Sequence, residues 1–280
     1  MNSTPAKRLG RGGPPAAMAR AALACTNAAL IVCAVGASAF AQAPPIVVER
    51  PSFSTPPNVV GTGFWQIESG LDWGHDAPDE GDGTTIFTAP NIALRLGVTR
   101  RIELRAATTG LVSTTERGRR STSMADTALG MKYQMAFQDG FGLDLAVVPM
   151  VSLPTGGAAS SNNVDPSVIL TAARQFGRAQ LNGNVKWTRQ SYGDTGNERA
   201  QILDWSLVLA HPLWGRWSAF WEGVASDSDL EGTRAIWVAN AGLARQFGES
   251  ILVDVYGGIG LNEPAPNWRV GAGFGWRLRR

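Results

Sequence analysis

Thirteen charged residues fall at positions that would share one face if the segments around them are alternating β-strands. They are Glu68, Asp72, Arg95, Glu103, Arg105, Lys132, Asp144, Lys186, Asp204, Glu222, Asp254, Arg269 and Arg277. Arg95 and Glu103 are expected to meet diagonally across a tight turn at 99–101. Because an unpaired buried charge is costly, the charges can pair and fill a narrow interior. They can also form a charge ring that filters solutes, and both roles stay open.

The two histidines are placed too far apart for shared chemistry. The strand assignment puts His75 in the first outer loop and His211 near the periplasmic end of its strand, on opposite sides of a membrane. They therefore cannot hold one metal ion or serve one nucleophile. His75 lies beside Asp76, which we interpret as a solvated loop pair. The sequence contains no phosphate-binding glycine loop, no GxSxG and no HExxH, so we expect no enzyme, no metal site and no cofactor.

The start of the chain, residues 1–41, has the parts of a secretory signal peptide. A basic segment at 1–20 precedes an apolar run of twenty residues, and small residues follow. Cleavage is expected after Ala41 or Ala43. A membrane anchor is the alternative, but Asn27 interrupts the apolar run and two prolines follow it directly, which favours cleavage.

Both cysteines, Cys25 and Cys33, lie in this leader, so the mature chain is expected to lack disulfides and thiolate metal sites. A lipoprotein anchor is the weaker alternative, because Val32 is too large to precede Cys33 and Cys25 precedes most of the apolar run. Cleavage also removes four basic residues and no acid, which lowers the formal charge from +2 by four to −2. No basic stripe remains, so nucleic acid is not an expected partner.

Residues 44–62, PPIVVERPSFSTPPNVVGT, are rich in proline and cannot form a central strand or a helix interior. We expect them to form an extended arm on the periplasmic side or partly inside the mouth of a barrel.

From Gly63 onward apolar and polar residues alternate with period two, which is typical of β-strands. Twelve such segments lie near 63–74, 86–98, 102–106, 129–137, 141–153, 166–176, 180–190, 203–210, 217–222, 234–247, 251–261 and 268–278. Tight turns near 99–101, 138–140, 177–179, 213–216 and 248–250 alternate with longer polar connections at 75–83, 112–123, 155–165, 191–199, 226–233 and 262–266. We therefore predict an all-β fold, a single antiparallel transmembrane β-barrel of about 12 strands over residues 63–280.

Four tryptophans mark the expected membrane interfaces. Trp65 and Trp73 lie eight residues apart on one face of the first strand, as Trp268 and Trp276 do on the last. Eight residues span roughly 26 Å, and a tilt of ~40° leaves a rise of roughly 20 Å, close to the ~25 Å apolar band. The first and last strands of a barrel are neighbours, so these rings form a predicted aromatic girdle at the seam. A soluble β-sandwich, with its apolar face inward, is the alternative.

Several short motifs, taken in order, resemble one family of outer-membrane proteins. They are ERPSFSTPPNVVGTGFWQIESG, LGVTRRIELR, DTALGMKYQM, VVPMVSLPTG, WSAFWEG and LVDVYGGIGLNEPAPNWRVGAGFGWRL. Over about residues 49–278 the chain resembles the MetA-pathway of phenol degradation family. This resemblance implies an outer-membrane barrel linked to aromatic-compound degradation and transport, with no catalytic residues. The chain ends in Leu278-Arg279-Arg280 instead of an aromatic residue, so Trp276 or Leu278 is the candidate assembly signal.

We predict a channel or binding protein in the outer membrane of a Gram-negative cell, for passive uptake of small solutes, aromatic or hydrophobic ones among them. Outer-membrane lipid and the barrel-assembly machinery are the expected partners. The alternative is a filled structural or interaction barrel without transport, its lumen blocked by paired charges and by the arm. A lipid-acting barrel enzyme is a third hypothesis, and the positions of the histidines argue against it.

Overall fold

The computed structural model describes residues 46–50, 52–77, 83–192 and 198–279. The predicted signal peptide and both predicted cleavage positions lie outside these residues. No helix within them is long and apolar enough to cross a membrane. The elements in chain order are β1 (Phe64–Asp76), β2 (Thr84–Gly97), β3 (Ile102–Thr108), β4 (Leu111–Glu116), β5 (Arg119–Met124), β6 (Thr127–Ala136), α2 (Gln138–Phe141), β7 (Asp144–Leu153), β8 (Asp165–Phe176), β9 (Ala179–Tyr192), β10 (Glu198–Pro212), β11 (Trp217–Ser228), β12 (Ile236–Phe247), β13 (Ile251–Gly260) and β14 (Trp268–Arg279).

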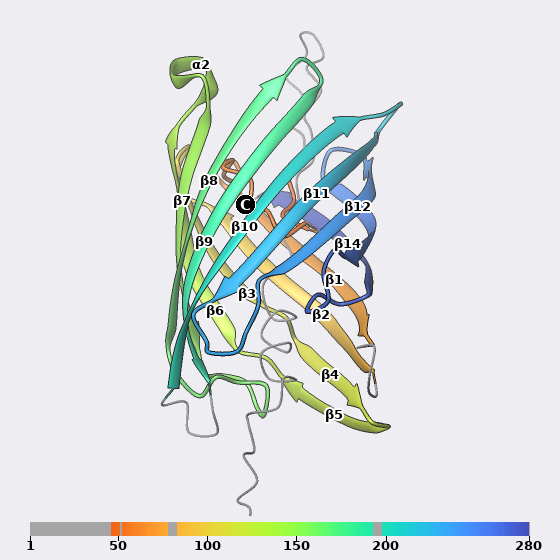
Figure 1. The fold of residues 1–280 in the computed structure, drawn as a ribbon. Coiled ribbons are helices and arrows are strands. Elements are labelled where there is room, and N and C mark those ends of the chain that lie inside the picture. Colours follow the sequence, from red (N-terminus) through yellow and green to blue (C-terminus); the bar gives the residue numbers. More distant parts are fainter. Residues whose placement is uncertain (1–45, 51, 78–82, 193–197, 280) are drawn as a thin grey trace, which may run out of the picture.

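All of these strands except β4 and β5 close into one antiparallel barrel (Figure 1). Each wall strand pairs with the next wall strand in sequence, and β3 pairs with β6 across the intervening hairpin. The ring is closed by β1, which pairs with β2 on one side and with β14 on the other. The prediction of a single antiparallel barrel with about 12 strands is confirmed.

The polar connection predicted at 112–123 is wrong, because these residues form the hairpin β4–β5. One strand, β4, continues the pairing of β2 beyond the end of β3, and β5 pairs with β4. The turn between them has positive φ at Arg117 (50°) and Gly118 (71°), which matches the twist of a two-residue hairpin. Ser, Thr and Arg occupy both faces of this hairpin, so its sequence lacks the alternation of the barrel wall. Figure 1 shows the hairpin projecting past one end of the barrel.

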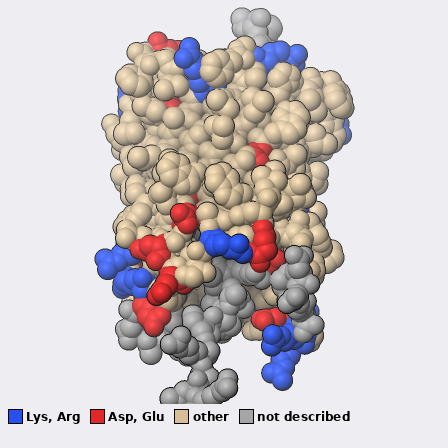
Figure 2. Space-filling view, in the orientation of Figure 1, with Lys and Arg blue, Asp and Glu red and all other residues tan. Residues whose placement is uncertain are grey.

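The barrel is apolar outside and polar inside. Leu207 and Trp221 are 56% and 51% exposed on the outer surface, whereas Glu68, Glu103 and Lys132 are fully buried inside. The middle of the visible surface is almost free of charged side chains, which gather toward the two ends (Figure 2). A soluble sandwich has the opposite arrangement, so the membrane-barrel interpretation is the one that the structure supports.

Short and long connections lie at opposite ends of the barrel. The turn end carries the connections 98–101, 137–143, 177–178, 213–216 and 248–250. The loop end carries the hairpin β4–β5 and the connections 154–164, 229–235 and 261–267. The connections predicted at 191–199 and 226–233 are partly strand, because β9, β10 and β11 extend into them.

The arm lies inside the barrel in its described part, with contacts to walls on opposite sides. The backbone N–H of Val60 donates to Glu103 of β3 (2.8 Å), and the Ser52 hydroxyl donates to Glu222 of β11 (2.6 Å). Ile46 and Val48 belong to an apolar cluster that they form with side chains of β10 to β13. The arm therefore fills the interior that a barrel of this size would otherwise leave open.

Glycines on the inner face of the closing strands give the arm its room. A Cβ at Gly275 of β14 would overlap Val48, and a Cβ at Gly273 would overlap the guanidinium of Arg50. On β2, a Cβ at Gly97 would overlap the backbone of Gly61, where the arm returns to the wall. Several of the many glycines in the strands thus have a steric reason, a close approach of a second backbone or side chain.

Candidate functional site in the barrel lumen

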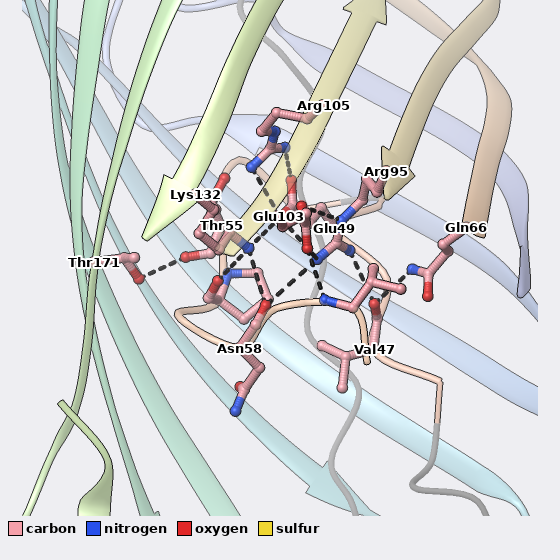
Figure 3. A network of polar contacts seen from close by, with 12 residues as sticks. Val47, Glu49, Thr55, Asn58, Gln66, Arg95, Glu103, Arg105, Lys132 and Thr171 are labelled. Carbon is pink, nitrogen blue, oxygen red and sulfur yellow. Dashed lines mark hydrogen bonds and ion pairs between the residues drawn. The ribbon is translucent and has the colours of Figure 1, made fainter. Parts of the chain in front are cut away.

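The centre of the lumen is a cluster of charges built around Glu49 of the arm. The Lys132 ammonium donates to Glu49 Oε1 (2.5 Å), and Arg105 forms two hydrogen bonds with the same carboxylate. Arg95 Nη2 lies 3.4 Å from Glu49 Oε1. Figure 3 shows these side chains converging on the arm from β2, β3 and β6. One carboxylate of the arm thus faces three cations of the wall.

Two wall carboxylates complete the cluster. Arg95 binds Glu103 through two hydrogen bonds of 2.8 Å, and its Nη1 donates to Glu68 Oε1 (2.8 Å). The bidentate pair crosses the turn after β2 diagonally, as its spacing in the sequence predicts. Such fork-shaped contacts are the strong form of a charged hydrogen bond. We call the six residues the charge cluster: Glu49, Glu68, Arg95, Glu103, Arg105 and Lys132.

The charge cluster is balanced and buried. It holds three carboxylates and three cations, and the most exposed member, Arg105, is 9% exposed. Burial opposes ionisation of Glu49, but Arg105, Arg95 and Lys132 outweigh it and hold the pKa of Glu49 well below its usual range. Glu49 is therefore charged, and removing any one member would leave an uncompensated buried charge.

Backbone groups of the arm are satisfied by the same wall residues. The Glu49 N–H donates to Glu68 (2.7 Å), while Lys132 also donates to the carbonyl of Pro56 (2.7 Å). On the far side, the Thr171 hydroxyl donates to the carbonyl of Thr55 (2.6 Å). A buried backbone group needs such a partner, so the wall is built to receive this particular segment.

A second anchor for the arm is Glu222 of β11. Its Oε1 accepts from the Ser52 hydroxyl (2.6 Å), from the Phe53 N–H (2.9 Å) and from the N–H and hydroxyl of Ser54 (both 3.1 Å). Its Oε2 accepts from Asn240 Nδ2 (2.8 Å). Glu222 is 4% exposed, and these donors satisfy both of its carboxyl oxygens.

Arg269 of β14 contacts the arm through an aromatic ring. Its guanidinium lies 4.3 Å from the ring centre of Phe53, and its Nη2 donates to the Tyr256 hydroxyl (2.7 Å). That hydroxyl is also hydrogen-bonded to Asp72, which lies 3.6 Å from Arg50 of the arm. Asp72 and Arg269, which the sequence places on neighbouring strands, are thus linked through Tyr256.

Two more predicted inward charges form an ion pair away from the arm. Lys186 Nζ lies 3.6 Å from Asp204 Oδ2, and both side chains are partly exposed inside the loop-end half of the lumen. Asp144 does not join any of these groups. It lies at the turn end, where it accepts from the Gln138 backbone N–H (3.0 Å), so its contact stabilises a turn.

The last two predicted inward charges differ in their surroundings. Asp254 is 1% exposed, and neither carboxylate oxygen has a hydrogen-bond partner within the described residues. Arg277 stacks on Phe64 (5.2 Å) and donates to the Glu249 carbonyl (2.9 Å) at the turn end. The functional roles of all thirteen charges remain predictions.

The four predicted girdle tryptophans lie on the outer face of the β1–β14 seam. Trp65 and Trp276 are offset by two residues in the register at the turn end. Trp73 and Trp268 lie near the loop end, with their rings edge to face at 5.3 Å. The rings thus form two levels along the seam, and their contact with a membrane interface stays a prediction.

The histidine placement is partly corrected by the structure. His75 lies on the outer face of β1, not in a loop, and its Nδ1 is 2.9 Å from the Thr85 hydroxyl of β2. His211 lies near the turn end of β10, opposite Ala219. Among the described residues no group of His, Cys, Asp or Glu could hold a metal ion.

Several residues of the site escape sequence reasoning. Glu49, Arg50 and Ser52 belong to the arm, which has no strand period and therefore no predictable face. Gln66 lies on a predicted inner face of β1 and donates to the Val47 carbonyl (2.7 Å), so the period of β1 could have identified it. For the arm, the available signal was a Glu-Arg pair within a segment otherwise poor in charge.

Residues 48–278 match the family described as "Putative MetA-pathway of phenol degradation". The chain belongs to this family. The resemblance that the motifs indicated over nearly the same residues is confirmed. No curated protein sequence matches this member of the MetA-pathway family.

Solved structures similar to this MetA-pathway family member are outer-membrane barrels. The NanC porin is 9% identical, with a TM-score of 0.51 over 76% of this chain and 100% of NanC. The translocator domain of the autotransporter NalP from Neisseria meningitidis is 13% identical, with a TM-score of 0.49 over 78% of this chain and 90% of that chain. The KdgM porin is 12% identical, with a TM-score of 0.43 over 74% and 98%. The likeness to NanC supports the fold, an outer-membrane type of barrel.

Proposed function

We propose that this protein is an outer-membrane channel for passive uptake of small solutes, aromatic or hydrophobic ones among them. The observation that carries the proposal is the reversal of polarity: an apolar outer surface surrounds a lumen lined by charged and amide side chains. A wall of this kind needs lipid outside and water or polar contents inside. Outer-membrane lipid and the barrel-assembly machinery are the partners that such a chain would require.

The arm sets how wide the path can be. It crosses the lumen at the charge cluster and is held there by hydrogen bonds, ion pairs and packing. In the loop-end half, a cavity of about 130 Å³ is bordered by Thr108, Asp165, Lys186 and Thr188. Because the arm occupies the lumen at the charge cluster, the resting path is narrow. Wider passage would require the arm to shift.

The preference for aromatic or hydrophobic solutes is supported by the family, whose description refers to phenol degradation. Catalysis is not part of the proposal. His75 and His211 lie toward opposite ends of the barrel, which leaves no shared base for a nucleophile.

A filled barrel without transport is the second candidate, and one observation favours it. The charge cluster balances its own charges while it holds the arm across the lumen. This candidate predicts that the mature protein is electrically silent in a bilayer and that solutes do not cross it.

Planar-bilayer recording of the refolded mature protein tests the proposal, with liposome swelling in phenol, sugar and amino-acid solutions beside it. We expect a small, steady conductance and measurable flux of phenol. A variant that lacks residues 46–60 should conduct several times more, because the obstruction is gone. A silent wild type that admits no solute would refute the channel and support the filled barrel, whatever the shortened variant does.

A further inference from the structure

Phe53 occupies an aromatic-binding position on the barrel wall. Its ring lies over the Arg269 guanidinium at 4.3 Å, and Arg269 also lies 5.2 Å from the ring centre of Tyr256. A guanidinium within about 6 Å of a ring face is attracted by the negative charge of that face. Arg269 is therefore positioned between two aromatic rings, one that belongs to the wall and one that the arm supplies.

The position is lined by apolar side chains as well. Val224 of β11, Val238 of β12 and Ala265 of the last long connection form a buried cluster, and Phe53 packs against it. All three come from the loop-end half of the barrel. Phe53 itself is only partly buried, whereas its neighbours Ser52 and Ser54 are buried.

An unused acceptor lies beside the arginine. Asn240 Nδ2 donates to Glu222, while Asn240 Oδ1 is buried and has no hydrogen-bond partner within the described residues. A Cβ at Gly258 would overlap this oxygen and would lie 3.0 Å from Arg269 Cγ. The oxygen and the stem of Arg269 are thus neighbours across the bare backbone of Gly258. Buried acceptors are usually satisfied, so this one marks a place for a donor that the chain does not supply.

We propose that this wall binds a small aromatic solute with a hydroxyl group, of the phenol class, in competition with the Phe53 ring. The ring of the solute would lie on Arg269 and against Val224 and Val238. Its hydroxyl would donate to Asn240 Oδ1. The inference rests on the proposed function, since the solute must reach the lumen, and Phe53 is then a built-in occupant that solute displaces.

Binding is measured by fluorine NMR of 4-fluorophenol added to the refolded mature protein in lipid nanodiscs, with empty nanodiscs as the baseline. Phe53→Ala removes the competing ring and should bind the probe about tenfold more tightly than wild type. Cyclohexanol, which has the hydroxyl but no aromatic face, and benzene, which has the face but no hydroxyl, should each displace the probe at least about tenfold less well than phenol.

Two further substitutions distinguish specific binding of phenol from nonspecific binding in the cavity that Phe53→Ala leaves. In the Phe53→Ala background, Arg269→Gln should remove the advantage of phenol over cyclohexanol, and Asn240→Leu should remove its advantage over benzene. If Arg269→Gln does not fold, Arg269→Lys replaces it and should reduce the advantage over cyclohexanol without removing it, because lysine keeps the charge but lacks the flat guanidinium that stacks on a ring. No saturable binding to Phe53→Ala above empty nanodiscs, or equal displacement by all three compounds, would overturn the inference.

The same preparations are recorded in planar bilayers, which keeps the two proposals distinguishable. Current through the wild type together with an absence of probe binding leaves the channel standing and removes the phenol site. Saturable, phenol-selective binding to a silent protein supports the site and removes the channel.

Discussion

Lys132 Nζ of β6 and Glu49 Oε1 of the arm lie 2.5 Å apart inside the barrel, separated by 83 positions in the sequence. Lys132 also donates to the carbonyls of Pro56 and Asn58, so one cation of the wall binds the arm at three points of its length. Both side chains are buried. The contact joins the segment that fills the lumen to the wall that encloses it.

Neutralising Glu49 should loosen the arm. Glu49→Gln keeps the shape of the side chain but leaves Lys132 and Arg105 with one counter-charge fewer, at a cost of about 3 kcal/mol in arm docking. That corresponds to roughly a hundredfold larger undocked population. We expect a higher and noisier bilayer conductance. Glu263→Gln, which alters an ion pair exposed at the loop end, is the control and should behave as wild type. Identical recordings from Glu49→Gln and wild type would contradict the role of the charge cluster.

Replacing both Lys132 and Glu49 should destabilise docking of the arm by less than the sum of the two single replacements. Lys132→Met leaves Glu49 short of a cation, and Glu49→Gln leaves a cation in excess, but the double variant restores the balance of charge. We expect a coupling energy of about 1–3 kcal/mol from a double-mutant cycle on resistance of the arm to protease. Strictly additive effects would show that the two residues stabilise the arm independently.

A change on the wall can expel the arm without touching any charge. Gly275→Val adds a side chain at a position where even a Cβ atom would overlap Val48, so the arm must move. Gly223→Val is the matched control, because a Cβ there meets no atom within 4 Å. Conductance should rise in the first variant and stay unchanged in the second. Equal conductance in both would show that contact between Val48 and β14 does not hold the arm.

Acid should release the arm. The pKa of Glu49 is lowered in the folded protein, so its contribution to docking is complete above the usual glutamate value of 4.5 and is lost as pH falls below it. We expect the arm to stay protected from protease at neutral and mildly acidic pH. Protection should then decline on further acidification. In Glu49→Gln the part of this decline that belongs to Glu49 should be absent. A decline that is the same in both proteins would show that Glu49 is not the group responsible for the acid response.

Lys186 can be used to test the ion selectivity of the channel in a barrel that stays folded. Its ion pair with Asp204 is long, at 3.6 Å, and partly exposed, so it contributes about 1 kcal/mol at most. Lys186→Glu should leave the barrel folded on a heat-modifiability gel and should shift the preference of the channel toward cations. Unchanged reversal potentials in a salt gradient would show that permeant ions do not pass this residue.

The barrel and the direction of its faces could be predicted because both follow from local rules. Alternation sets the face of each side chain, so Glu68 and Lys132 are assigned inward from their own strands alone. The position of the arm depends instead on contacts with strands that follow it by up to 222 residues. Glu49 has no periodic neighbours that would give it a direction, and it was missed for that reason.

Single errors have equally local causes. Asp144 occupies an inward position at the first residue of β7, but a carboxylate at a strand end is within reach of the preceding turn and accepts from Gln138. The sequence predicts that His75 lies in a loop, because the residues after Trp73 are mostly polar. The structure shows that β1 continues through His75 to Asp76. The hairpin β4–β5 is not predicted from the sequence because it extends beyond the apolar band. Its strands therefore do not require the alternation of apolar and polar residues that identifies the strands of the wall.

The order of the arm and the strands in the sequence bears on when the arm docks during folding. The arm precedes β1 and is made before the wall, yet Arg50 donates to the Ala272 carbonyl of β14 and Ser52 to Glu222 of β11. Those acceptors are brought around it only when the first and last strands have met. Seating of the arm is thus a late folding event that follows closure of the seam between β1 and β14.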